Sequence, residues 1–304
     1  MPHSVIEPST VVIVGATAVG KSAAALALAD CQEIEIINAD SMQGYVGMDI
    51  GTAKASVEQQ ATVRHHVIDV WPHSRDISVV VFRDAARSAI SAVRARGVTP
   101  VVVGGSWLYV QAILDDLTFP PTDPDLRAFW EDQLQERGVA SLHAELGLKD
   151  PAAAKSILPN NARRIVRALE VVDLQGSFAA QLPEPKPWCE AYWFGVDMER
   201  KHIDDRIGLR VDQMWRSGFV DEVRELSVMG FGRTSAQALG YAQILRQLAG
   251  EISEAEAIET TVRATQRFAR RQQRRFAQDG RIEWLNGQSG PAEVARIMRQ
   301  RIAT

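Results

Sequence analysis

The chain has 304 residues, of which 46% are hydrophobic and 24% are charged, close to the usage of an average globular protein. This composition excludes a disordered, collagen-like or coiled-coil protein, and no apolar run approaches the roughly 20 residues that span a bilayer. The net charge of −4 argues by itself against a nucleic-acid partner. A length about twice that of an ordinary domain predicts two domains, or one large domain with an insertion.

Two features of the sequence predict a cytoplasmic protein. Residues 1–10 lack the basic region and the long apolar run of a secretory signal. Cys31 and Cys189 form neither a disulfide framework nor a metal-binding spacing, so we expect buried free thiols in a reducing compartment.

The first hundred residues alternate short apolar runs with helical patterns. Residues 11–14, 34–37 and 101–103 are rich in β-branched side chains and are expected to be buried strands. Residues 23–29 and 79–95 are expected to be helices. This alternation predicts a parallel sheet wound in right-handed crossovers, with ligands at the carboxyl ends of the strands.

The middle of the chain has a helical pattern from residue 126 to residue 174, between proline-rich boundaries at 119–124 and 182–187. Breaks are expected at Asp150-Pro151 and Leu158-Pro159. The apolar run at 191–196 predicts another strand, so we expect the sheet to resume after a helical insertion.

A phosphate-binding loop follows the first strand and opens the first helix. Residues 15–22 are a complete G-x-x-x-x-G-K-[ST] motif in the strand–helix context that identifies a P-loop. The glycines let the backbone close on a diphosphate, Lys21 supplies a mobile cation, and Ser22 is placed to bind Mg²⁺. The residues expected to bind the diphosphate are Gly15, Ala16, Thr17, Ala18, Val19, Gly20, Lys21 and Ser22.

These elements together predict an α/β fold, a P-loop parallel sheet core flanked by helices, with an all-helical insertion domain. The core comprises residues 1–119 and 188–304, the second part ending in a helical C-terminal portion. The insertion domain occupies residues 120–187.

The ends of two predicted strands bear on the reaction. P-loop kinases and ATPases need an acidic residue at the end of a later strand to hold the metal ion. Residues 101–103 are followed instead by Gly104-Gly105-Ser106, which weakens nucleotide hydrolysis without eliminating it. The second strand leads into Asp40, which by itself is compatible with a helix N-cap, a catalytic base or a metal ligand.

Further motifs occur together and in order along the chain, after the P-loop. They are Ala39-Asp40-Ser41-x-Gln43-x-Tyr45, Asp49-Ile50-Gly51-Thr52-Ala53-Lys54, His65-His66-x-Ile68-Asp69, Val103-Gly104-Gly105-Ser106-x-Leu108-Tyr109, Arg164-x-x-Arg167-Ala168-Leu169-Glu170, Thr265 to Gln272 and Ile282-Glu283-Trp284-Leu285. With the P-loop, this series resembles the tRNA dimethylallyltransferase (tRNA isopentenyltransferase) family, which prenylates N6 of the adenosine 3′-adjacent to the anticodon. The resemblance covers about residues 11–285.

The resemblance implies that the P-loop binds dimethylallyl diphosphate instead of ATP, with Mg²⁺ as cofactor and the tRNA anticodon stem-loop as the second substrate. Asp40 would orient N6 and accept its proton, and Ser106 would bind the leaving-group oxygen. Thr17 and Lys21 would contact the diphosphate, which makes these four residues the expected catalytic set. A monomer without membrane association is expected.

A basic stripe near the C-terminus qualifies the argument from net charge. Residues 263–281 contain seven arginines and one acid, a net charge of +6 on a remainder of −10, and a local field of this kind attracts a polyanion. A helix over 258–276 would place most of these arginines opposite an apolar face. A solvated helix face is the alternative here, and ion pairs within the domain are the alternative for the insertion arginines. The residues assigned to tRNA binding are Asp40, Ser41, Met42, Gln43, Arg127, Arg163, Arg164, Arg167, Gln237, Gly240, Tyr241, Arg267, Arg270, Arg271 and Arg274.

Other functions remain as alternatives at this point. A P-loop nucleotide kinase or ATPase shares the phosphate loop, and a prenyltransferase acting on free adenine nucleotides shares both the loop and Asp40. Neither would need the insertion or the basic stripe. Arg206 and Arg210, one turn apart on a predicted helix, are equally compatible with diphosphate contact and with surface ion pairs. The chain departs from the family pattern at positions that concern RNA contact, namely Ala242, Arg275 and Ala277.

Overall fold

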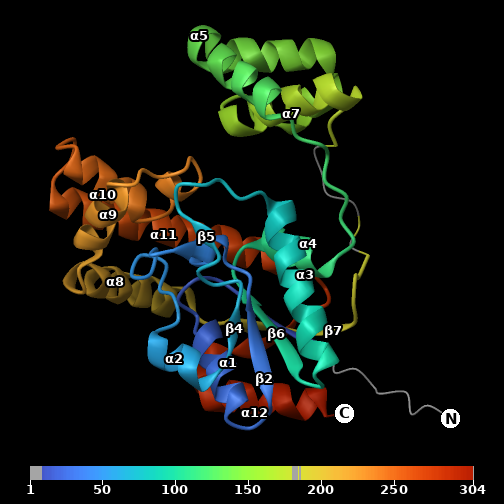
Figure 1. The fold of residues 1–304 in the computed structure, drawn as a ribbon, viewed down its shortest axis with the longest axis vertical. Coiled ribbons are helices and arrows are strands. Elements are labelled where there is room, and N and C mark those ends of the chain that lie inside the picture. Colours follow the sequence, from blue (N-terminus) through green and yellow to red (C-terminus); the bar gives the residue numbers. More distant parts are fainter. Residues whose placement is uncertain (1–8, 180–183, 185, 304) are drawn as a thin grey trace. The chain divides into compact units, whose positions relative to one another are not determined.

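A computed structural model of the chain describes residues 9–179, 184 and 186–303 (Figure 1). Its contacts divide the chain into two compact units, Met1–Asp115 with Pro187–Thr304, and Asp116–Lys186, which are described separately below. Part of the proline-rich boundary predicted at 182–187, and residues 1–8 of the segment tested for a secretory signal, lie outside the described residues.

The larger unit is built on a six-stranded sheet in the order β4-β2-β6-β1-β7-β8, in which every neighbouring pair is parallel (Figure 1). The predicted P-loop α/β class and the four predicted strands are confirmed. The strand β8 was not predicted, because only helices were expected after residue 196. The strands are β1 (Thr10–Val14), β2 (Ile34–Asn38), β4 (His65–His66), β6 (Thr99–Gly104), β7 (Ala191–Asp197) and β8 (Glu283–Asn286), with β3 (Tyr45–Val46) and β5 (Trp71–Pro72) pairing separately.

The predicted helices at 23–29, 79–95 and 258–276 correspond to α1, α3 and α11. Among the described residues, no helix combines the length and the apolar character needed to cross a membrane. The helices of this unit are α1 (Lys21–Ala29), α2 (Val57–Thr62), α3 (Val79–Ala95), α4 (Trp107–Leu114), α8 (Arg200–Arg216), α9 (Phe219–Ser227), α10 (Tyr241–Leu248), α11 (Glu254–Phe276) and α12 (Pro291–Ile302), with 3₁₀ helices at Ser41–Gly44, Ser235–Gln237 and Gly287–Ser289.

Alternating side chains of the strands build a core on each face of the sheet. In β1, Val12 and Val14 belong to the core that includes residues of α3 and α4. Val11 and Ile13, one step out of phase, belong to the core that includes residues of α1 and α12. All four are fully buried. Since successive strand residues point to opposite faces, a sheet covered on both sides requires such continuous apolar strands.

The carboxyl ends of β1, β2 and β6 lie at one edge of the sheet. In the strand register, Val14 of β1 pairs with Gly104 of β6, and Asn38 of β2 pairs with Val103. A Cβ on Gly104 would lie 2.6 Å from the Cβ of Ala39, so this close approach requires glycine. The P-loop, the Asp40 turn and the Gly105–Ser106 turn therefore open at the same edge.

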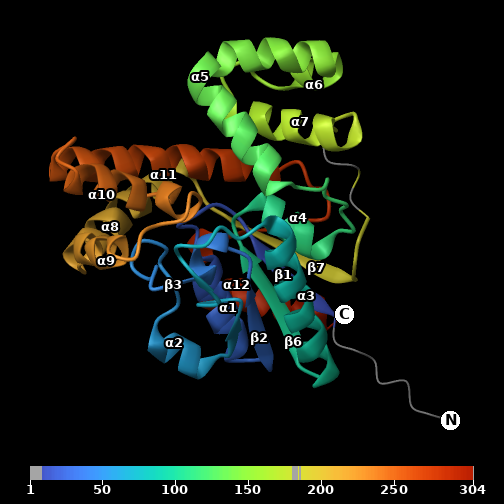
Figure 2. The ribbon, with the colours of Figure 1, turned by 45° about the horizontal axis from the view of Figure 1, so that its top comes forward.

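The smaller unit, Asp116–Lys186, is helical and has its own apolar core around Trp130, Leu142 and Ile165 (Figure 2). The break expected at Asp150-Pro151 is present, and Asp150 caps the following helix by accepting a hydrogen bond from the N–H of Ala153. A further break at Gly138 (φ 76°) was not predicted. The helices are α5 (Pro124–Lys149), α6 (Pro151–Ser156) and α7 (Ala162–Gln175).

Candidate active site

The P-loop forms one wall of a cavity of about 360 Å³ at the carboxyl edge of the sheet. Gly20 adopts φ 103°, in the left-handed region that favours glycine, and the chain enters α1 at Lys21. The Nζ atom of Lys21 donates a 2.6 Å hydrogen bond to the carbonyl of Ala16. Five of the eight predicted loop residues line the cavity, namely Thr17, Ala18, Gly20, Lys21 and Ser22.

Asp40 lines the same cavity from the end of β2. Its carboxylate caps the 3₁₀ helix Ser41–Gly44 by accepting a 3.0 Å hydrogen bond from the N–H of Met42. The Asn38 side chain holds the Asp40 backbone on both sides, accepting from its N–H and donating to its carbonyl, each at 2.8 Å. Burial raises the pKa of Asp40, against the lowering effects of the Met42 N–H and of Lys21. The Asp40 carboxylate thus caps the 3₁₀ helix, as one of its three interpretations predicted, and it also lines the cavity, so the capping role does not exclude a role in the site.

Three cationic side chains line this cavity. Arg210 donates a 3.2 Å hydrogen bond from Nη1 to the hydroxyl of Thr17, and Arg206 lies one turn earlier on α8. Burial and the neighbouring Arg210 lower the pKa of Lys21 to about 8, while Asp40 opposes this shift. Burial and Arg206 lower the pKa of Arg210. Each lowered pKa shows that the charged form of these side chains is disfavoured by burial and by a neighbouring cation. A bound polyanion would relieve this by compensating the positive charge.

Gln272 of α11 joins the P-loop to the turn after β6. Its Oε1 accepts a 2.9 Å hydrogen bond from the N–H of Thr17, and its Nε2 donates a 2.8 Å hydrogen bond to the carbonyl of Gly105. A Cβ on Gly105 would lie 2.4 Å from that Nε2. Ser106 follows at the N-cap of α4, and its hydroxyl makes no capping hydrogen bond. Gln272 ends the family motif Thr265 to Gln272, but no role in the site was predicted for it.

Gln43 is the second residue of the predicted Asp40–Gln43 turn to line the cavity. Its Nε2 donates hydrogen bonds to the carbonyls of Thr52, at 3.1 Å, and Ala53, at 3.4 Å. Ser41 and Met42 are partly exposed beside it. The amide of Gln43 is therefore oriented by a loop from a different motif.

The helix α11 carries the basic stripe, and it packs against α8 and α10 (Figure 2). Ala269, Gln272 and Phe276 are buried on one face, as the helical pattern predicted. Arg270 lies 3.8 Å from Asp204, and Arg271 lies over the ring of Phe268. The exposed arginines of this helix are Arg263, Arg267, Arg270, Arg271, Arg274 and Arg275.

Comparison with known proteins places the chain in a family. The model of the IPP transferase family matches residues 43–279. The chain belongs to the IPP transferase family. It is 50% identical to a tRNA dimethylallyltransferase of Salinispora arenicola, over 96% of this chain and 86% of that protein. It is 52% identical to a tRNA dimethylallyltransferase of Thermobifida fusca, over 91% and 90% of the two chains.

Solved structures agree with this assignment. The chain superposes with a TM-score of 0.71 on the full-length tRNA isopentenylpyrophosphate transferase of Bacillus halodurans, at 37% identity and 97% coverage of both chains. A eukaryotic dimethylallyltransferase acting on tRNA shares the fold, with a TM-score of 0.73 at 24% identity over 92% of this chain and 74% of that one. The predicted family is confirmed.

Arg281 was counted among the seven arginines of the basic stripe, but its side chain forms ion pairs with acidic residues instead of lying on the exposed face of α11. Its Nη1 lies 2.6 Å from Asp115, its Nη2 lies 2.6 Å from Asp279, and the guanidinium stacks 4.1 Å from the ring centre of Trp193. Asp115 is fully buried, so a cation must accompany it. The charge of Arg281 is therefore neutralised inside the unit.

The arginines of the smaller unit have different surroundings. Arg127 and Arg167 both pair with the fully buried Glu170, and Arg167 also donates to the carbonyls of Pro120 and Pro121. This is the ion pairing within the domain that the sequence analysis held as the alternative. Arg163 and Arg164 are exposed, and so is Arg137, which pairs with Glu145.

The predicted contacts at 237–241 are divided between the surface and the interior. Gln237 is exposed, whereas Gly240 and Tyr241 are buried. The hydroxyl of Tyr241 donates a 2.5 Å hydrogen bond to Glu222, a residue that no motif in the sequence analysis singled out. No sequence signal predicts Glu222, because it lies on the polar side of an ordinary amphipathic helix.

Proposed function

We propose that this enzyme transfers the dimethylallyl group of dimethylallyl diphosphate to N6 of the adenosine 3′-adjacent to the anticodon in tRNA. The observation that carries the proposal is that Asp40 and Lys21 line one cavity, which brings a partly buried carboxylate and a phosphate loop to the same site. The relatives that are half identical to the chain are tRNA dimethylallyltransferases.

The cations of the cavity bind the diphosphate. Lys21, Arg206 and Arg210 supply positive charge, and the N–H groups at the start of α1 supply further donors. The N–H of Thr17 already donates to Gln272, so Thr17 contributes its hydroxyl. Ser106, at the N-cap of α4, does not line the cavity itself, but it follows Gly105, which does, and would contact the leaving-group oxygen. These groups stabilise the charge that develops as diphosphate departs.

The residues present fit a magnesium ion bound with the diphosphate. Ser22 lines the cavity, and the described residues contain no cluster of three or more His, Cys, Asp or Glu side chains that could hold a metal. Mg²⁺ usually takes few protein ligands and completes its shell with phosphate oxygens and water. Ser22 Oγ would hold the ion, which when bound neutralises diphosphate charge.

Asp40 acts on the adenine. N6 attacks C1 of the allyl group, so that the N6–C1 bond forms as the C1–O bond to diphosphate breaks. The proton of N6 passes to the Asp40 carboxylate, and the pKa raised by burial makes this carboxylate a stronger base than an ordinary aspartate. A base inside an anticodon loop reaches such a buried group only when it leaves its stack, and the amide of Gln43 is positioned to hydrogen-bond it.

The arginines provide the sequence-independent part of tRNA binding. Arg267, Arg270, Arg271 and Arg274 are exposed along α11 at helical spacing, which suits phosphates of one RNA strand. In the smaller unit, the exposed Arg163 and Arg164 would also contact RNA phosphates. Arg127 and Arg167 are paired with Glu170, so they would contribute positive charge beside these contacts. Gln237 adds an exposed polar group. Gly240 and Tyr241 are buried, so they would support the tRNA-binding surface through packing instead of contacting the RNA.

The enzyme acts as a monomer in the cytoplasm, where tRNA is modified. Cys31 and Cys189 are free thiols, as expected in a reducing compartment, although both are only partly buried.

The deciding experiment incubates the enzyme with dimethylallyl diphosphate, Mg²⁺ and unmodified tRNA, and measures the mass of the RNA. We expect one added dimethylallyl group, located at N6 of the adenosine beside the anticodon. Parallel incubations with free adenine nucleotides and with ATP test the alternatives. Alkylation of free nucleotides alone, or phosphate release from ATP without tRNA, would contradict the proposal.

A further inference from the structure

Glu222 of α9 binds the backbone of a distant loop. Its Oε2 accepts hydrogen bonds from the N–H groups of Asp49, at 3.1 Å, and Ile50, at 2.7 Å, and its Oε1 accepts one from the N–H of Gly51 at 3.3 Å. The hydroxyl of Tyr241 donates to Oε1 at 2.5 Å. One carboxylate thus accepts hydrogen bonds from three consecutive backbone N–H groups.

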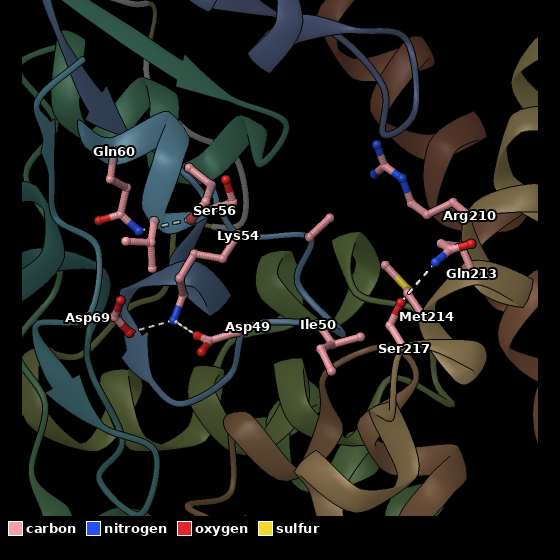
Figure 3. Close-up of a pocket in the computed structure, with 13 residues that line it drawn as sticks. Asp49, Ile50, Lys54, Ser56, Gln60, Asp69, Arg210, Gln213, Met214 and Ser217 are labelled. Carbon is pink, nitrogen blue, oxygen red and sulfur yellow. Dashed lines mark hydrogen bonds and ion pairs between the residues drawn. The ribbon is translucent and has the colours of Figure 1, made fainter. Parts of the chain in front are cut away.

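The loop that Glu222 binds, residues 49–54, packs closely against the first residues of α9 and α10. A Cβ on Gly51 would lie 2.2 Å from the ring of Phe219 and 2.5 Å from the ring of Tyr241. The far end of the loop is also tied down. The side chain of Lys54 is only 3% exposed, and its Nζ donates hydrogen bonds to the carbonyl of Tyr45. It also donates to the carboxylates of Asp49 and Asp69, at 2.5 Å each (Figure 3).

The loop 49–54 in turn orients Gln43. The carbonyls of Thr52 and Ala53 accept both hydrogen bonds that the structure records for the Gln43 amide nitrogen. Thr52, Ala53 and Gln43 all line the cavity that contains Asp40. The same loop also lines a second cavity, of about 480 Å³, that shares Ala53, Ala55 and Arg210 with the first (Figure 3).

We propose that Glu222 is a positioning residue for tRNA, which acts through loop 49–54 to fix the amide of Gln43 for contact with the target base. Tyr241 holds the Glu222 carboxylate in place by donating a hydrogen bond from its hydroxyl. This inference rests on the proposed function, because it assumes that Gln43 meets the RNA. Neither Glu222 nor Tyr241 lines the cavity, so neither touches the reacting atoms.

The chemistry of this arrangement requires a carboxylate. An amide at position 222 would keep one acceptor oxygen but would turn its NH₂ group towards backbone N–H groups, placing donor against donor. Burial and the Glu222 charge raise the pKa of Tyr241, so its phenol remains a donor at any pH at which the enzyme works. Glu222→Gln should therefore weaken the hold on loop 49–54 and so raise KM for tRNA. Glu222→Ala should raise KM for tRNA further, and Tyr241→Phe should raise it least.

The test is a double-mutant cycle between Glu222→Ala and Gln43→Ala, with steady-state kinetics on both substrates. We expect each single variant to raise KM for tRNA about tenfold, equivalent to about 1.4 kcal/mol. KM for dimethylallyl diphosphate should stay within about twofold of the wild type in both variants. In the double variant, Glu222→Ala should add little to Gln43→Ala, because the two act on one contact. Glu225→Ala, an exposed glutamate on the same helix, is the matched control and should change nothing.

A purely structural role for Glu222 would give a different pattern. The melting temperature would fall while KM for tRNA stayed unchanged below the transition, or the effects of the two substitutions would simply add; either result would overturn the inference. Glu222→Gln and Tyr241→Phe repeat the comparison with smaller changes should Glu222→Ala fold poorly. Failure of the wild type to alkylate tRNA would instead refute the proposed function itself.

Discussion

The side-chain Oε1 of Gln272 accepts a 2.9 Å hydrogen bond from the backbone N–H of Thr17, across 255 positions of the chain. Gln272 lies on the buried face of α11, and the opposite face of that helix carries the exposed arginines. The helix proposed to bind tRNA therefore also supports the loop proposed to bind diphosphate.

Gln272→Leu should weaken the use of dimethylallyl diphosphate. The substitution leaves the Thr17 N–H and the Gly105 carbonyl without their partner, and a buried polar group that loses its hydrogen bond costs about 1–3 kcal/mol. We expect KM for this substrate to rise about tenfold or more while the Kd for tRNA changes little. Gln278→Leu, at an exposed position just after the helix, is the control. Unaltered kinetics with the diphosphate substrate would show that the P-loop holds its shape alone.

Asp40→Asn should cut turnover by about 10²-fold or more, the usual contribution of a positioned base. An asparagine keeps an oxygen to cap the N–H of Met42 but cannot accept the N6 proton, so the fold should be intact. Asp40→Ala removes both roles and should lose at least as much turnover. The measurements are single-turnover rates and circular dichroism. Near-normal turnover in either variant would rule out Asp40 as the base.

Lys21→Ala should raise KM for dimethylallyl diphosphate and slow the chemical step. The lysine charge meets negative charge that develops on the leaving group, so the loss is greater in the transition state than in the ground state. The Kd for tRNA should barely change. A collapse of tRNA binding with unchanged diphosphate kinetics would mean that the loop has another function.

The pH dependence should be bell-shaped in kcat/KM for dimethylallyl diphosphate. Asp40 must be ionised, and burial raises its pKa, so the acidic limb should lie above the range of an ordinary aspartate. Lys21 must be protonated, and its pKa is lowered to about 8, so activity should fall as the pH rises through about 8. In Lys21→Arg, whose side chain keeps its charge, the alkaline limb should move to higher pH. An alkaline limb that stays in place would assign it to another group.

Arg270→Ala combined with Arg274→Ala should weaken tRNA binding and flatten its salt dependence. Each phosphate contact that is removed lowers the slope of log K against log salt by somewhat under one unit. Turnover at saturating tRNA should change little. The control is Arg299→Ala with Arg301→Ala on α12, which removes the same charge elsewhere. Salt plots parallel to that of the wild type would identify the stripe as a solvated helix face.

The fold class and the P-loop were predictable because their signals are local. A G-x-x-x-x-G-K-[ST] run between a strand and a helix specifies its own backbone, and the continuous apolar strands specify a sheet covered on both faces. The edge strand β8 was missed, since four residues with one buried side chain carry little periodicity. The break at Gly138 was missed because a single glycine inside a helical pattern is usually tolerated.

The sequence by itself determined which chemical groups the enzyme has: the phosphate loop, Asp40, the Gly105–Ser106 turn and the arginines of α11. Only the tertiary structure decided how those groups are supported. Glu222 reaches residues 49–51 across more than 170 positions, and Arg281 is drawn inward by the buried Asp115. The physical reason is that hydrogen bonds and ion pairs between distant residues leave no periodicity in the sequence, because each depends on two backbones that meet only after the sheet has formed.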